Sequence, residues 1–221
     1  MKISFKRILA VLFFSIVTVG AFAQIDRVRD SEYYPRNELY IQYGTPTVME
    51  LVTVLSKDYV SGGQHYEGDS RNHKFSGVAG IGYNFSITPK FAMGIYGGIS
   101  YSSADLYILH AEGINLKEPL KICRSNIMNY SGQLSATMIY WQRGPWECSG
   151  ALYLGVAYLY ETVDVIDNEY FAPEPDSRLK FAYHITPVKF RYGDEIGVFA
   201  ELGFGYRGLL NVGLSIKIES I

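Results

Sequence analysis

The C-terminal stretch from Glu195 to Ile218 constrains the fold more than any other part of the sequence. Apolar side chains occupy every second position on both sides of a tight Arg207-Gly208 connection. They are Ile196, Val198, Ala200, Leu202, Phe204 and Tyr206 before the connection, and Leu210, Val212, Leu214, Ile216 and Ile218 after it. A period of two is typical of β-strands, whose side chains alternate between two faces. The stretch therefore predicts a hairpin with one wholly apolar face.

The other face of this hairpin is small, polar or charged, and it is compatible with two kinds of protein. It carries glycines together with Glu201, Asn211 and Lys217. In a soluble β-sandwich the apolar face would be the core, and the polar face would meet water. In a membrane β-barrel the apolar face meets lipid, and the polar face points into the lumen. The hairpin alone leaves both open.

The first 23 residues predict a secretory signal peptide. Three basic residues precede an apolar run, and Ala21-Phe22-Ala23 has the small-x-small form of a cleavage site. The apolar run is shorter than the roughly 20 residues that a membrane-spanning helix needs. Its removal leaves 17 basic and 22 acidic residues, a net charge of −5. We therefore expect a mildly acidic exported protein that does not bind nucleic acid.

Six further stretches alternate in the same way, which brings the expected number of strands to eight. They cover residues 37–44, 73–86, 91–102, 128–140, 152–161 and 181–192. In the last of them the apolar phase shifts at Pro187, which predicts a β-bulge. Residues 24–36 are expected to be a polar periplasmic lead-in, and residues 37–218 to be the barrel domain.

The connections between these strands are alternately long and short. The long ones cover residues 45–72, 104–125 and 164–178, whereas residues 88–90, 143–145 and 193–194 make tight turns. Outer-membrane barrels combine short periplasmic turns with long outer loops, so this alternation favours the membrane barrel. The short connection at Arg207-Gly208 is the exception.

The first long connection also predicts a short amphipathic helix. Thr45-Pro46 is typical of an N-cap followed by proline at the first helical position. After it, Val48, Leu51, Val52 and Leu55 recur at helical spacing. We therefore expect one short helix in the first outer loop.

Aromatic residues on the apolar faces are expected to form two girdles. Those near the short turns are Phe85, Phe91, Tyr140, Trp146, Phe190 and Tyr192, and those near the long loops are Tyr101, Tyr130, Tyr158, Tyr160, Phe181 and Tyr206. Tyrosine and tryptophan concentrate at membrane interfaces, and a soluble sandwich would not show such bands. The predicted fold is therefore all-β: an eight-stranded antiparallel up-and-down transmembrane β-barrel with one short helix.

By its strand pattern, its export signal and the glycine-aromatic segment from Glu201 to Tyr206, the chain resembles the small eight-stranded outer-membrane barrels of the OmpA and OmpX type. The resemblance covers residues 37–218. It implies a bacterial outer-membrane location, with membrane lipid and the barrel assembly machinery as partners, and we expect a monomer. In this family the chain usually ends in an aromatic residue, whereas here Ile218 is followed by Glu219-Ser220-Ile221.

Eight strands enclose a lumen only wide enough for side chains to fill, so a large pore is not expected. The titratable residues that we expect to point inward are Glu161, Lys180, His184, Lys189, Arg191, Glu201 and Lys217. In such a confined space, charges must pair or find water. We interpret them as ion pairs that fill and stiffen the barrel, and a narrow ion path is the alternative.

Two cysteines, Cys123 and Cys148, lie in a chain that is expected to reach an oxidising compartment. The predicted layout places Cys123 near the outer end of the barrel and Cys148 beside an inner turn. We therefore expect no disulfide between them.

No sequence pattern predicts catalysis, a cofactor or a metal site. His184 is the one histidine expected in the lumen, and no motif places a serine or aspartate beside it. The other histidines lack zinc-ligand spacing, and the acidic residues 164–176 lack the glycine-spaced pattern of a calcium loop. The expected function is therefore non-enzymatic: a structural role, or display of three long extracellular loops to an unidentified ligand. A lipid-modifying or hydrolytic membrane barrel and a soluble ligand-binding barrel remain as alternatives.

Overall fold

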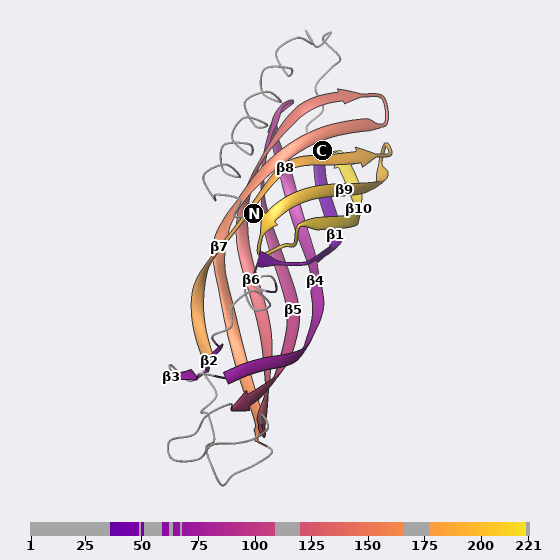
Figure 1. Ribbon diagram of the computed structural model, residues 1–221. Helices are drawn as coiled ribbons and strands as arrows, with labels where there is room; N and C mark the ends of the chain where they lie inside the picture. Colours follow the sequence, from indigo (N-terminus) through magenta and orange to yellow (C-terminus); the bar gives the residue numbers. More distant parts are fainter. Residues whose placement is uncertain are drawn as a thin grey trace, which may run out of the picture.

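The structure, a computed structural model, describes residues 36–48, 50, 59–61, 64–66, 68–108, 120–165 and 177–219. Eight antiparallel strands close into a barrel in the order β1-β10-β9-β8-β7-β6-β5-β4 (Figure 1). The prediction of an all-β, eight-stranded antiparallel barrel is confirmed. The predicted signal peptide lies outside the described residues, as does all of the lead-in except Arg36.

The barrel strands are β1 (Arg36–Thr45), β4 (Gly68–Thr88), β5 (Phe91–Ile108), β6 (Leu120–Arg143), β7 (Trp146–Val165), β8 (Ser177–Tyr192), β9 (Ile196–Gly205) and β10 (Leu210–Glu219). Two short strands, β2 (Tyr59–Ser61) and β3 (Gln64–Tyr66), pair with each other in a separate sheet. The ring closes because β1 pairs with both β4 and β10. Arg36 faces Glu219 at the end where the three tight turns lie, which we call the turn end; the opposite end is the loop end.

One wall of the barrel is taller than the other. Strands β4 to β8 continue toward the loop end beyond β1, β9 and β10 (Figure 1). The sequence predicts loops in several of these extensions, and that prediction is wrong for residues 68–72, 104–108, 120–125, 164–165 and 177–178. It is also wrong for residues 59–61 and 64–66, which form β2 and β3. In these segments the apolar alternation of the belt does not continue, although the backbone pairing does.

The chain leaving β1 carries a capping box, the reciprocal pair of hydrogen bonds that begins a helix. The Glu50 backbone N–H donates to Thr47 Oγ1 at 3.1 Å, and the Thr47 N–H donates to Glu50 Oε2 at 2.6 Å. The cap is therefore Thr47 and not Thr45, which ends β1. The helix predicted to run to Leu55 lies outside the described residues except for Val48 and Glu50, and it stays a prediction. No helix in the described part of the chain is long and apolar enough to cross a membrane.

The predicted bulge in β8 is confirmed. The pairing of β8 with β9 jumps from Ile185–Phe204 to Val188–Leu202, so the extra residues lie around Pro187. Because Pro187 has no N–H to donate, a position outside the regular ladder suits it. Beyond the bulge, the inward positions of β8 become Lys189 and Arg191.

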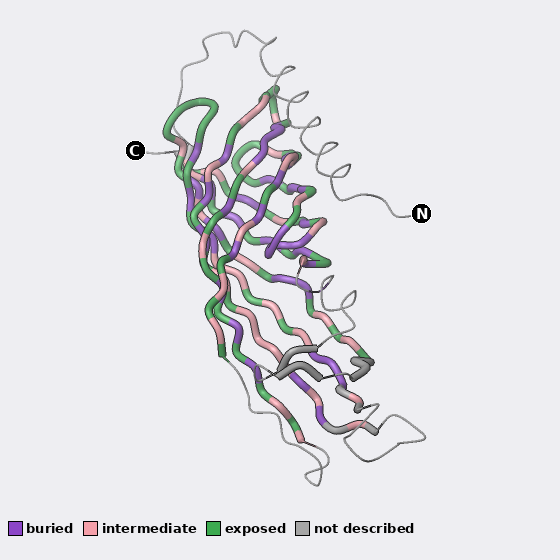
Figure 2. Tube along the Cα trace, turned by 60° about the vertical axis from the view of Figure 1, so that its left-hand side comes forward, coloured by how far each residue is buried: buried purple, intermediate pink, exposed green. Residues whose placement is uncertain are grey.

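Buried and exposed residues alternate along the strands (Figure 2). In β9, Val198 and Leu202 point outward, whereas Phe199 and Glu201 are buried inside. The barrel interior is packed by an aromatic cluster, Tyr40, Tyr96, Tyr153 and Phe199, together with many polar side chains. Glycines on the inner face give the rings their space: a Cβ at Gly80 would lie 2.1 Å from the Tyr96 hydroxyl. The interior is thus filled and polar, and the exterior is apolar.

Candidate functional site

The outward face of the barrel carries a belt of apolar side chains. Leu134, Phe181 and Ile196 are 66 %, 65 % and 71 % exposed. Toward the loop end the outward positions change to polar residues, such as Asn126 on β6 and Asp164 on β7, whose side chains hydrogen-bond at 2.9 Å. At the turn end the belt gives way to the polar residues of the tight turns. The belt is therefore bounded at both ends.

Ten of the twelve aromatic residues expected in the girdles are exposed on this face: Phe85, Phe91, Tyr101, Tyr130, Trp146, Tyr158, Tyr160, Phe181, Phe190 and Tyr192. Tyr140 is partly buried, and its hydroxyl donates to the Pro187 carbonyl at 3.0 Å. The expected place of Tyr206 in the outer girdle is wrong, because this side chain is only 6 % exposed. β9 ends at Gly205, whose φ is 142°, and the chain then turns into the barrel. Tyr206 packs there on Ala157 and Ala182.

Glu38 on β1 organises the charges in the turn-end half of the lumen. Its carboxylate lies 3.2 Å from Lys189 Nζ and 3.6 Å from Arg191 Nε. Asn84 donates to the same carboxylate at 3.2 Å and accepts from Ser135 Oγ at 3.1 Å. One acid from β1 thus joins β8, β4 and β6 across the interior.

Arg191 also closes the turn end of the lumen. It donates to Ser215 Oγ at 2.7 Å and to the carbonyls of Gly193, Asp194 and Glu195 in the β8–β9 turn. Nearby, Lys217 pairs with Glu147 across the barrel. Because every one of these cations has a carboxylate or carbonyl partner, the cost of burying the charges is offset locally.

Arg207 organises the loop-end half, and its side chain is fully buried. Nη2 lies 3.0 Å from Glu201 Oε1 and donates to Gln42 Oε1. The guanidinium carbon lies 3.8 Å from the ring centre of Tyr153, 4.6 Å from that of Tyr96 and 5.8 Å from that of Tyr40. Three electron-rich faces around one cation are a favourable arrangement. Arg207 thereby fills the cross-section of the lumen at this level.

The connection between β9 and β10 positions Arg207 by folding into the barrel. Asn211 Nδ2 donates to the Gly208 carbonyl at 3.1 Å, and the Leu209 N–H donates to the Pro46 carbonyl at 2.8 Å. Gly208 has a φ of 117°, a conformation that glycine adopts readily. The short Arg207-Gly208 connection, the exception to the alternation of long and short connections, therefore folds inward and plugs the barrel.

The structure places the seven predicted lumen residues in separate groups. Glu161, His184, Lys189, Arg191 and Glu201 are buried, Lys217 is nearly so, and Lys180 is half-buried. Lys189 and Arg191 share Glu38 as a partner. Glu201 pairs with Arg207, Lys217 pairs with Glu147, and Glu161 accepts from Ser125 Oγ at 2.6 Å. His184 accepts the Arg207 backbone N–H at Nδ1, at 3.4 Å.

Three charged residues of these lumen networks are missing from the sequence prediction: Glu38, Glu147 and Arg207. Glu38 shares a strand face with Tyr40 and Gln42, so its alternation with Leu39 was a usable signal. Glu147 follows Trp146 at the start of a strand, where a single step of alternation indicates little. Arg207 lies in a turn, and no periodicity shows whether a turn folds inward or outward.

A second charged cluster lies beyond the apolar belt, where Asp105 joins β4, β5 and β6. Its carboxylate lies 2.8 Å from Arg124 Nε and 3.0 Å from Lys121 Nζ, and accepts from Asn72 Nδ2 at 3.0 Å. The hydrogen bond from Arg124 is the main reason that the pKa of Asp105 lies well below its ordinary value. This cluster ties the taller wall together outside the belt.

Cys123 and Cys148 are both free thiols, at opposite ends of the β6–β7 pair. Among the residues that the structure describes, no group of three histidine, cysteine, aspartate or glutamate side chains could hold a metal ion. No protein-family model matches the chain, and no curated protein matches it either.

Proposed function

We propose that the chain is an integral β-barrel protein of the bacterial outer membrane, with a filled lumen and a structural or surface-interaction role. The observation that carries the proposal is the inverted distribution of polarity. Leu134 and Ile196 are more than 60 % exposed, whereas Arg191 and Glu201 are 2 % exposed. Soluble monomers rarely expose contiguous apolar patches above a few hundred Å². With lipid around the belt, the apolar face of each strand contacts an apolar solvent, and the polar face packs inside the lumen.

The arrangement of the ends supports an orientation in that membrane. The tight turns lie at the same end of the barrel as Arg36 and Glu219, the first and last residues of the barrel strands. The taller wall extends at the opposite end. Small outer-membrane barrels of the OmpA and OmpX type have short periplasmic turns and long outer segments. We place the turn end in the periplasm and the extensions of β4 to β8 at the cell surface, where they would meet an external ligand.

The packing of the lumen favours a filled barrel over a catalytic or an ion-conducting one. Its charges pair with one another, and Arg207 stands between three tyrosine rings. These charged side chains are therefore engaged in contacts with one another inside the barrel. We therefore propose that the barrel presents its outer extensions and contributes no reaction of its own.

Membrane extraction tests the proposal. The chain expressed with its leader is expected to stay with membranes through an alkaline carbonate wash and to require detergent for release. The folded barrel is expected to migrate faster in gel electrophoresis before boiling than after it. Release into buffer without detergent would contradict the proposal and favour a soluble barrel.

A matched pair of arginine substitutions tests it at one residue. Leu134→Arg places a charge in the middle of the belt on β6, and we expect it to cost about 2–4 kcal/mol of stability in lipid vesicles. Gln142→Arg adds the same charge on the same strand at the turn end, where the expected change is within about 0.5 kcal/mol. Equal stability of the two variants would mean that Leu134 is exposed to water and not to lipid, which would contradict the proposal.

A further inference from the structure

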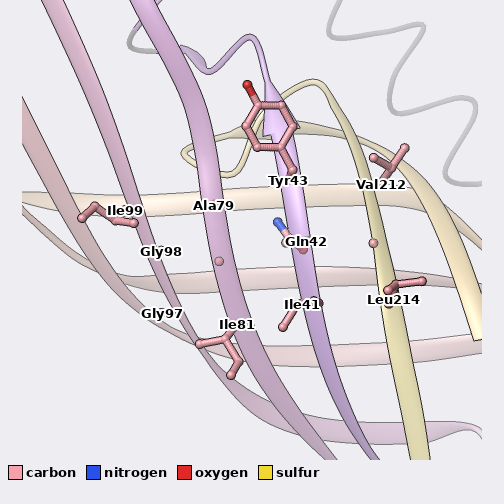
Figure 3. A pocket seen from close by; sticks show the side chains of 12 residues that line it. Ile41, Gln42, Tyr43, Ala79, Ile81, Gly97, Gly98, Ile99, Val212 and Leu214 are labelled. Atoms are coloured by element: carbon pink, nitrogen blue, oxygen red, sulfur yellow. The ribbon is translucent and has the colours of Figure 1, made fainter. Parts of the chain in front are cut away.

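The apolar belt is hollowed where β10, β1, β4 and β5 lie side by side (Figure 3). The hollow has a volume of about 710 Å³. Six side chains along its edges are between 41 % and 54 % exposed: Ile41, Tyr43, Ile81, Ile99, Val212 and Leu214. It lies on the outward face and is separate from the charged lumen.

Small residues form the floor of this hollow. Gly97 on β5 occupies an outward position between Ile95 and Ile99, and Ala79 on β4 occupies an outward position two residues before Ile81. A Cβ at Gly97 would meet no atom within 4 Å, so the space above this residue is open. An extended hydrocarbon chain lying here would contact walls as well as floor, and dispersion contacts add up over such a surface.

The loop-end rim above the hollow is polar and carries cations. On β5, Tyr101 donates its hydroxyl to Asn126 Oδ1 at 2.8 Å, and Ser103 follows, opposite the exposed Lys74 of β4. Ser103 lies four residues beyond Ile99, about 13 Å along the strand at roughly 3.3 Å per residue. Arg124 stands beside this rim with its side chain 43 % exposed. Because Arg124 is paired with Asp105 at 2.8 Å, the exposed Lys74 is the cation that follows the apolar hollow where the belt ends.

We propose that this groove binds one acyl chain of an anionic membrane lipid, whose phosphate lies against Lys74. This proposal rests on the proposed membrane location. The order of chemistry along β4 and β5 is apolar hollow, tyrosine rim and then ammonium group, which matches acyl chain, ester region and phosphate.

Filling the groove tests the acyl-chain site. Gly97→Leu occupies the open space, whereas Gly132→Leu adds the same side chain at the paired outward glycine of β6, which is equally open and does not line the groove. Native mass spectrometry of the detergent-solubilised proteins would follow binding of palmitoyl-oleoyl phosphatidylglycerol. We expect Gly97→Leu to weaken the first binding step at least about tenfold, since it displaces two or more methylene contacts. Gly132→Leu is expected to match the wild type.

A second pair of variants tests the headgroup contact. Lys74→Gln is expected to weaken phosphatidylglycerol binding about fivefold, the effect of one cation at an anionic lipid surface. Binding of the zwitterionic phosphatidylcholine with the same chains should not change. Lys90→Gln, which removes a cation at the turn end, should change neither. A Lys74→Gln variant that binds phosphatidylglycerol like the wild type would overturn the phosphate contact.

The outcomes separate this proposal from the membrane proposal itself. All five proteins are first inserted into vesicles and checked for the faster migration of the folded barrel before boiling. A wild type that does not insert would contradict the membrane location before any lipid is titrated. Inserted proteins in which Gly97→Leu and Gly132→Leu bind phosphatidylglycerol equally would overturn the groove alone.

Discussion

At the scale of single residues, Arg207 connects several strands across the interior. Its side chain joins Glu201 and Gln42, and its ring contacts reach Tyr153 and Tyr96 from two other strands. A buried ion pair is costly to break, because the remaining partner keeps its charge without compensation. The pair with Glu201 should therefore show strong coupling.

Replacing Arg207 by methionine is expected to destabilise the barrel by about 3–5 kcal/mol, because the Glu201 carboxylate is left buried and unpaired. Adding Glu201→Gln to the same chain should recover most of that loss. Urea unfolding in lipid vesicles, followed by tryptophan fluorescence, would measure both. Arg143→Met, at an exposed position of a tight turn, is the control. Unfolding of Arg207→Met and Arg143→Met at the same urea concentration would contradict a stabilising role of the Arg207–Glu201 pair.

The sequence predicts the direction of a side chain where a regular strand repeats, and fails where the repeat stops. Lys189 and Arg191 are assigned to the interior from their alternation with Val188 and Phe190, across the bulge at Pro187. The same alternation predicts that Tyr206 points outward. This prediction is wrong because Gly205 ends the strand. The partners of each charge depend on which strand stands opposite, and that is a property of the closed ring.

At the scale of elements, the taller wall depends on polar contacts beyond the belt. Asp105 of β5 is bonded to Arg124 and Lys121 of β6 and to Asn72 of β4. The extensions lie beyond the apolar belt, and fewer neighbouring strands flank them. The ion cluster is therefore expected to be a main source of order in this part of the sheet.

The depressed pKa of Asp105 gives this cluster a defined pH dependence. Because the folded pKa lies below the ordinary value of 3.8, the contribution to stability is present above that value and is lost as the pH falls below it, toward the folded pKa. Carboxyl ¹³C NMR of the protein in micelles would follow the titration. We expect no midpoint for Asp105 near 3.8 in the wild type, and an upward shift of the midpoint in Arg124→Gln. Identical midpoints in the two proteins would mean that Arg124 does not hold this carboxylate.

Loops and strands are the elements that the sequence separates least well. In residues 104–108 the apolar side chains move to the even positions Ala104, Leu106 and Ile108, so the alternation of the preceding strand does not continue. In residues 120–125 Arg124 follows Leu120 and Ile122 on one face, and alternation again does not reveal the pairing. The helix start is also displaced, because Thr45 and Thr47 are both good caps and only the reciprocal bonds of Thr47 with Glu50 distinguish them. The strands inside the belt are predicted correctly because outward and lumen-facing positions differ in polarity.

At the scale of the whole molecule, the filled interior predicts no steady conductance. Arg207 and three tyrosine rings occupy one level of the lumen, and Arg191 closes the turn end. Single-channel recording in planar bilayers is therefore expected to show no sustained openings. Steady openings that disappear in Glu201→Gln would contradict the filled lumen and favour a narrow ion path through the Arg207 level.

The eight barrel strands and the apolar belt follow from local alternation in the sequence. The short strands β2 and β3 and the unequal height of the wall do not, since they depend on how far neighbouring segments remain paired. The hollow over β10, β1, β4 and β5 cannot be predicted from the alternation either. Its small residues Ala79 and Gly97 lie diagonally on neighbouring strands, because Ala79 pairs with Ile99 and Ile81 pairs with Gly97, and only the register decides this.

Spin-label accessibility along β9 would show whether lipid or water contacts the apolar outer face of the barrel. Single nitroxide labels at Val198, Ala200 and Leu202 would be placed in vesicle-inserted protein whose two native cysteines are replaced by serine. We predict high collision rates with oxygen and low rates with a water-soluble nickel chelate at all three positions, since oxygen partitions into the bilayer and the chelate does not. High accessibility to the nickel chelate at these positions would show that water covers the belt, and would contradict the membrane assignment.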